Sequence, residues 1–95
     1  MNRIYFVMSD FDWDGENNAH IARHHVTPSE VEEVFKRKTV IKDDPFSAEQ
    51  RFDVYDRTAN GRYLVVLFIL RGARKRCVTE YPMNRSTRRK YAPHL

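Results

Sequence analysis

Eight apolar residues follow one another without a break from Tyr63 to Leu70, and this run constrains the fold more than any other feature of the chain. Asn60-Gly61 stands just before it and is a strong hairpin signal, because a type I′ turn needs positive φ at both central positions. An apolar run of this length beside such a turn predicts a central β-strand that is covered on both faces.

Other patterns place further elements around this strand. We expect strands over residues 3–8, 39–42, 51–57 and 74–81, and helices over residues 15–24, 27–37 and 85–91. Hairpin connections make the sheet antiparallel. The predicted fold class is therefore α+β: an antiparallel four- to five-stranded sheet, with two N-terminal helices packed on one face and a short C-terminal helix.

The starts of the helices are marked by capping residues. Asp14 is the expected N-cap of the first helix and Asn84 that of the last. Thr27, Pro28 and Glu30 form a capping box with proline at the first helical position.

The size of the chain limits its organisation. The 95 residues correspond to a single domain over residues 1–95. Cys77 is the sole cysteine, which excludes an internal disulfide and suggests a small buried side chain in a strand. No run of 18 apolar residues predicts a membrane span, so we expect a cytoplasmic protein with no membrane contact.

Charge is distributed unevenly. Residues 1–50 contain 6 Lys and Arg against 10 Asp and Glu, whereas residues 51–95 contain 11 against 3. A basic half of this kind is typical of a protein with a phosphate-rich partner, although it can also balance the acidic half across the fold. Nine of the 11 cations are arginines, whose planar guanidinium groups suit bidentate phosphate contacts.

The arginines and tyrosines of this half are candidates for RNA contacts. Alternation along residues 74–81 places Arg74 and Arg76 on one face and Lys75, Cys77, Thr79 and Tyr81 on the other. The predicted RNA-binding residues are Arg57, Arg74, Arg85, Arg88 and Arg89. Tyr55, Tyr63 and Tyr81 lie among the arginines and could either stack on unpaired bases or pack in the fold.

Histidines are the candidates for proton transfer. His20 and His24 are four residues apart and would share one face of the first helix. Such a pair can act as a proton carrier, bind zinc with a further ligand, or simply pack at the helix end. Asp10, Asp12 and Asp14 do not complete a calcium loop, because Ile21 stands where the bidentate glutamate is needed. We expect no metal site and no cofactor.

Three stretches together resemble one protein family. Residues 13–35 (WDGENNAHIARHHVTPSEVEEVF), residues 57–66 (RTANGRYLVV) and residues 83–91 (MNRSTRRKY) are similar to segments of the BrnT family. The resemblance covers roughly residues 11–91 in order.

This resemblance implies a fold, an activity and a partner. It implies a RelE-like fold and the toxin half of a bacterial type II toxin–antitoxin module, acting as a metal-independent ribonuclease. The implied partners are RNA and a small DNA-binding antitoxin, in a dimer or a heterotetramer with that antitoxin.

The chain departs from the family pattern at Glu80, Tyr81, Thr87 and His25. The family usually has an arginine at the position of Tyr81, a small residue at that of Glu80, a glutamate in the last helix at that of Thr87 and a glycine at that of His25. Loss of the arginine and gain of Glu80 weaken phosphate binding on this strand. These changes favour an alternative: a weakened or inactive module that binds RNA or protein on the same fold.

The leading hypothesis gives each residue a role in RNA cleavage. His24 is the first choice of proton carrier and His20 the second. Arg62 and Arg76, with Arg85, would stabilise negative charge on the phosphate, and Tyr81 would stack on a base or donate a proton.

Overall fold

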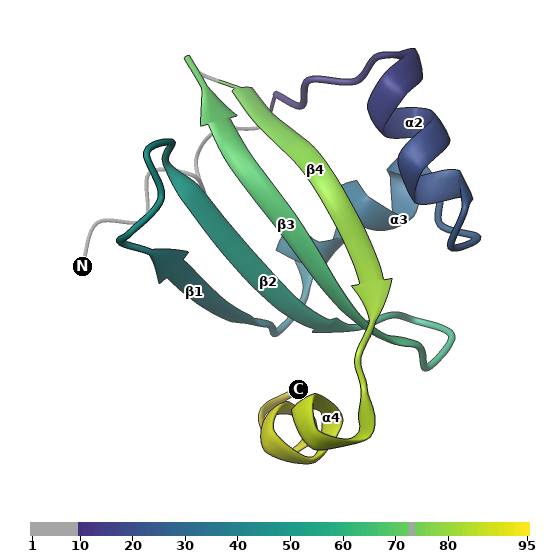
Figure 1. The fold of residues 1–95 in the computed structure, drawn as a ribbon. Coiled ribbons are helices and arrows are strands. Elements are labelled where there is room, and N and C mark those ends of the chain that lie inside the picture. The colour runs from purple at the N-terminus through teal and green to yellow at the C-terminus, as the bar shows by residue number, and fades with distance from the viewer. Residues whose placement is uncertain (1–9, 73) are drawn as a thin grey trace.

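The computed structural model describes residues 10–72 and 74–95, which form one antiparallel sheet with helices (Figure 1). In chain order the elements are α2 (Gly15–Ala22), α3 (Pro28–Glu32), the 3₁₀ helix η1 (Glu33–Lys36), β1 (Val40–Asp44), β2 (Arg51–Arg57), β3 (Tyr63–Arg71), β4 (Arg74–Pro82), α4 (Arg85–Tyr91) and the 3₁₀ helix η2 (Ala92–His94). The strands are ordered β1-β2-β3-β4, and every neighbouring pair is antiparallel. The α+β class is confirmed, with four strands in the described residues; the strand expected at residues 3–8 lies outside them.

β3 lies inside the sheet and is buried on both faces, as its unbroken apolar sequence predicts. Leu64, Val66 and Phe68 belong to the core on one face. Val65, Leu67 and Ile69 point to the other face and are also at least 92% buried.

The first face of the sheet is covered by the segment that contains α2 and α3 (Figure 1). Ile21 of α2, Val26 of the connection, Val31 of α3 and Val34 of η1 form one apolar cluster with β2, β3 and β4. Phe35 adds a ring 5.3 Å from that of Phe68. Burial of these side chains holds the short helices in place, since helices of this length are not stable alone.

α4 lies at the end of the sheet where β4 finishes (Figure 1). Its Tyr91 ring stacks on Tyr55 of β2 with 3.9 Å between ring centroids. Burial raises the pKa of Tyr55 to about 12, with a hydrogen bond to Tyr91 as a further cause. α4 thus covers only one end of the second face.

The capping residues predicted from sequence are confirmed. Asp14 accepts from the N–H groups of Glu16 and Asn17, Thr27 from that of Glu30, and Asn84 from that of Thr87. The last helix has the predicted bounds, whereas the first ends at Ala22 instead of residue 24. The second is α-helical only to Glu32 and continues as η1.

The hairpin at residues 58–62 is wider than the predicted two-residue turn. Gly61 has a φ of 86°, but Asn60 has no positive φ, so the type I′ prediction is wrong. The N–H of Gly61 donates to the carbonyl of Thr58, whose own N–H donates to the carbonyl of Arg62. Only Gly61 takes the left-handed conformation, which glycine adopts without steric cost.

β4 contains a register shift that changes which residues share a face. Cys77 is opposite Phe68, but Thr79 is opposite Leu67, so Val78 is an extra residue in the strand. The predicted alternation over residues 74–81 is therefore wrong after Cys77. Thr79 and Tyr81 lie on the same face as Arg74 and Arg76, and Glu80 turns toward the helices.

A buried ion pair joins η1 to the sheet. The guanidinium of Arg37 donates two hydrogen bonds of 2.8 Å to the carboxylate of Asp56, which is fully buried in β2. The same hydrogen bonds raise the pKa of Arg37. An unpaired carboxylate at this position would be costly.

Arg37→Met should lower the free energy of unfolding by about 3 kcal/mol, because it leaves Asp56 buried without its partner. Arg51→Met is the control, since Arg51 pairs with the partly exposed Asp44 and Asp53 and should contribute less than about 1 kcal/mol. Urea denaturation at pH 7 measures both values. Equal losses from the two substitutions would contradict this account.

Candidate active site

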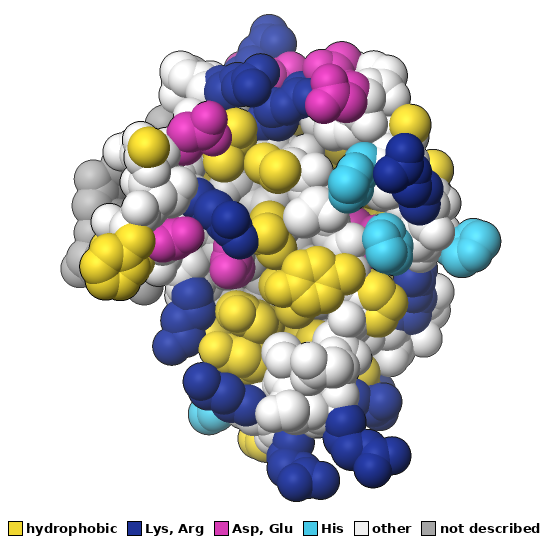
Figure 2. Space-filling model, viewed as in Figure 1, with side chains coloured by type: hydrophobic (Ala, Val, Ile, Leu, Met, Phe, Trp, Pro, Cys, Tyr) yellow, Lys and Arg dark blue, Asp and Glu magenta, His cyan; other side chains and the backbone are white. Residues whose placement is uncertain are grey.

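The second face of the sheet, which α2 and α3 leave uncovered, is called the open face below. Figure 2 shows a strip of hydrophobic side chains along its middle, histidines gathered on the side of α2, and Lys and Arg side chains around α4. At the end opposite α4, acidic and basic side chains are mixed. The two ends of this face therefore differ in charge.

A cavity of about 450 Å³ lies at the mixed end, between α2 and the sheet. Leu67, Ile69 and Val78 give it an apolar surface. Its charged lining residues and its histidine are Asp14, Glu16, His20, Glu49, Arg51, Arg71 and Arg76. The cavity therefore combines a histidine with three guanidinium groups.

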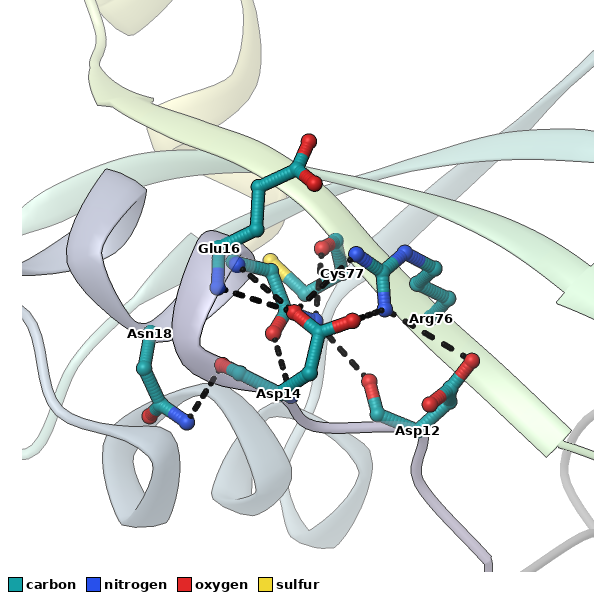
Figure 3. Close-up of polar contacts among 7 residues, drawn as sticks. Asp12, Asp14, Glu16, Asn18, Arg76 and Cys77 are labelled. Atoms are coloured by element: carbon teal, nitrogen blue, oxygen red, sulfur yellow. Dashed lines mark hydrogen bonds and ion pairs between the residues drawn. The ribbon is translucent and has the colours of Figure 1, made fainter.

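Arg76 is held in this cavity by the carboxylates that precede α2 (Figure 3). Its guanidinium donates to both oxygens of Asp14 at 2.9 and 3.3 Å and lies 3.6 Å from Asp12. The hydrogen bond with Arg76 lowers the pKa of Asp14 and raises that of Arg76. Asp14 thus caps α2 and orients Arg76 at the same time.

His20 is the predicted histidine that reaches the cavity. It lies in the last turn of α2, and its Nε2 is 2.7 Å from the hydroxyl of Thr79. The buried Asn17 holds the same helix against β4, because its side-chain amide donates to the carbonyls of Asp12 and Cys77. The sequence suggested neither contact.

His24 and Arg62, two other predicted catalytic residues, lie away from this cavity. His24 is in the turn that follows α2 and does not line the cavity. Arg62 donates to the backbone carbonyls of His24 and His25 at 2.8 and 2.9 Å. The guanidinium of Arg62 thus closes the helix end, beside His25 in the left-handed conformation at a φ of 60°.

The remaining predicted residues are spread along the open face. Tyr81 is 43% exposed in the half of β4 nearer α4. Arg74 lies at the opposite end of the strand. Arg57 lies at the end of β2 beside α4, which itself contributes Arg85, Arg88 and Arg89. The structure thus brings His20 and Arg76 together and places the α4 arginines elsewhere.

A comparison with protein families identifies the chain. Residues 13–86 match the model described as "Ribonuclease toxin, BrnT, of type II toxin-antitoxin system". The chain belongs to the BrnT family. No curated protein and no solved structure matches it. Membership of a toxin–antitoxin family implies an antitoxin partner.

The matched range of this BrnT family member contains the whole cavity and ends at the second residue of α4. Arg88 and Arg89 lie beyond it. Arg51 and Arg71 also line the cavity, although the sequence did not predict them as site residues. The register of β2 and β3 places them there, with Arg51 opposite Ile69.

Metal ligation and membrane spanning concern the described residues, 10–72 and 74–95. No group of three His, Cys, Asp or Glu side chains could hold a metal ion. No helix in residues 10–72 and 74–95 is long and apolar enough to cross a membrane.

Glu80 does not interrupt the basic surface of this BrnT family member, contrary to the expectation from its place in the strand. It is fully buried on the helix-covered face, and neither carboxylate oxygen has a hydrogen-bond partner within residues 10–72 and 74–95. Burial raises its pKa to about 7, although the charge of Arg62 opposes this shift. Cys77, on the same face, is buried as predicted, and burial raises its pKa to about 12.

Glu80→Gln should make the free energy of unfolding depend less on pH. In the wild type the pKa of Glu80 is higher when folded than when unfolded, so the folded chain binds more protons between about pH 4.5 and 7 and loses stability as the pH rises through this range. The stability of the variant relative to the wild type should therefore increase by about 2 kcal/mol from pH 4.5 to pH 8. Urea denaturation at both pH values measures it, and a difference that does not change with pH would contradict the prediction.

Proposed function

We propose that this chain is the toxin of a type II toxin–antitoxin module and cleaves RNA without a metal ion in the cavity of the open face. One observation carries the proposal: His20 and the guanidinium groups of Arg51, Arg71 and Arg76 line the same cavity of about 450 Å³. A titratable histidine beside several cations is what phosphodiester cleavage needs.

The proposed reaction uses the hydroxyl of the RNA itself. The 2′-OH attacks the adjacent phosphorus, and His20 accepts its proton. The guanidinium groups stabilise the extra negative charge that develops on the phosphate. Tyr81, exposed on the same face, donates a proton to the leaving 5′ oxygen. If Tyr81 instead stacks on a base, the protonated His20 gives its proton to that oxygen.

Contacts of His20 and Arg76 support their roles. The Thr79 hydroxyl holds the ring of His20, and Asp14 holds the guanidinium of Arg76, so both groups are oriented before a substrate arrives. Arg62 is left out of the proposed site because backbone carbonyls already occupy its guanidinium. His24 stays a competing proton carrier that experiment can separate from His20.

The wider setting follows from the family. We propose a RelE-like arrangement of the fold and a cytoplasmic location. A small DNA-binding antitoxin would neutralise the toxin, in a dimer or a heterotetramer. The basic surface around α4 and the exposed Tyr81 are available to RNA or to this antitoxin.

A second candidate function is RNA or protein binding without cleavage. Acidic side chains favour it: Asp14 and Asp12 already compensate the charge of Arg76, and Glu16 and Glu49 also line the cavity. These carboxylates repel phosphate at the position where cleavage would need a positive field.

His20→Ala should lower the rate constant of RNA cleavage by at least about 100-fold, because it removes the proton carrier. His94→Ala is the control, since His94 is an exposed histidine in η2 outside the cavity. The measurement is cleavage of a fluorescent RNA in EDTA by each purified variant. A loss with His24→Ala but not with His20→Ala would transfer the role to His24, and absence of cleavage by the wild type would favour the binding module.

A further inference from the structure

α4 combines a high positive charge with a lack of acidic partners. Four of its seven residues are Arg85, Arg88, Arg89 and Lys90, and all four are exposed. No carboxylate lies within 4.0 Å of any of them in the described part of the chain, whereas Arg37, Arg51 and Arg76 each have an acidic partner. The charge of α4 is therefore available to an external anion.

The position of Arg85 shows that the helix does not need the charge of this residue for its own stability. Arg85 is the first residue of α4, where the helix dipole disfavours a cation. The three other cations lie in the last turn, where the dipole favours them. A helix built only for stability would place an acidic residue in its first turn, and α4 has none.

Tyr63 orders two of the guanidinium groups at this end of the open face. The guanidinium carbon of Arg88 lies 4.4 Å from the centre of the Tyr63 ring, and that of Arg57 lies 5.7 Å from it. Arginines placed against an aromatic ring lose less freedom when they bind a phosphate. Met83 and Ala92 line a shallow depression with Arg85, Arg88 and Arg89.

An apolar strip connects α4 with the cavity. Along β3, Tyr63 lies near α4 and Ile69 lines the cavity, so six residues of strand, about 20 Å, separate the two. Tyr81 and Val78 of β4, each 43% exposed, lie beside this path. An exposed tyrosine between two sites that each contain guanidinium groups is an arrangement that can bind unpaired bases by stacking while the backbone is held at both ends.

We propose that α4, with Arg57, is a second contact for single-stranded RNA, separate from the cavity, and that the substrate strand crosses the open face over Tyr81 to reach it. The proposal rests on the proposed ribonuclease function. It adds the requirement that the RNA be long enough to contact both sites at once. A stacked strand advances about 3.4 Å per nucleotide, so about six nucleotides bridge the two sites. RNAs shorter than this should reach only one site at a time.

The test compares two substrates and two variants. The substrates are an RNA of 12 nucleotides and one of three nucleotides that contains the same cleaved step. The variants are Arg85→Gln/Arg88→Gln/Arg89→Gln and the control Arg23→Gln/Lys36→Gln/Lys38→Gln, which removes three exposed cations from the segment of α2 and η1. Both variants lose three positive charges, so the comparison is matched in net charge and differs in where the charge is lost.

We expect the α4 variant to lose at least about 10-fold in kcat/KM on the long RNA, mainly through KM, and less than twofold on the short one. The control should change neither by more than twofold. An equal loss on both substrates, or an equal loss from both variants, would overturn the second site while leaving cleavage in the cavity intact.

A binding measurement keeps the proposal testable if no RNA is cleaved. Fluorescence anisotropy with a labelled 12-nucleotide RNA at several salt concentrations gives the number of phosphate contacts, and loss of three arginine contacts should reduce the logarithmic slope by about 2. An unchanged slope would refute the proposal. The proposal would also be refuted if the α4 variant lost affinity for polyglutamate, a probe for an acidic protein partner, but kept its affinity for RNA.

Discussion

β3 is apolar from Tyr63 to Leu70, and such a run favours cover on both faces of the sheet where this strand lies. One face is covered by Ile21, Val31 and Val34 from the segment before the sheet. The other is covered by α4, but only at the end where Tyr91 stacks on Tyr55. The cavity therefore lies on the part of the open face that α4 does not cover, between α2 and the sheet.

The two charged ends of the open face follow from this arrangement. The acidic first half of the chain runs beside β4, and its Asp12 and Asp14 compensate Arg76 at the cavity. No carboxylate pairs with α4 within the described residues. The uneven charge of the sequence therefore separates the two ends of the open face. At the cavity, carboxylates compensate and orient Arg76. At α4, the cations are available to an external anion.

The register shift in β4 determines which residues take part. If Val78 were paired and the strand alternated regularly through it, Tyr81 would point at the helices and Glu80 would lie on the open face. With the bulge, Tyr81 is exposed beside the apolar strip and Glu80 is buried with no hydrogen-bond partner among the described residues. One bulge therefore removes an acidic group from the proposed RNA path and adds a base-stacking side chain.

Local features of the sequence determined the elements and their order. The capping residues Asp14, Thr27 and Asn84, and the apolar run of β3, act through neighbouring backbone groups and through burial, so their consequences could be read in advance. The stretches that resemble the BrnT family also indicated the family that the comparison confirmed.

The composition of the site depended on contacts between residues far apart in the chain. Arg76 meets Asp14, His20 meets Thr79, and Arg62 closes the end of α2, each across 37 residues or more. The bulge turned Thr79 toward His20, the helix end at Ala22 placed the carbonyls that Arg62 meets, and the packing of α2 against β4 brought Asp14 to Arg76, so tertiary contacts decided all three pairings.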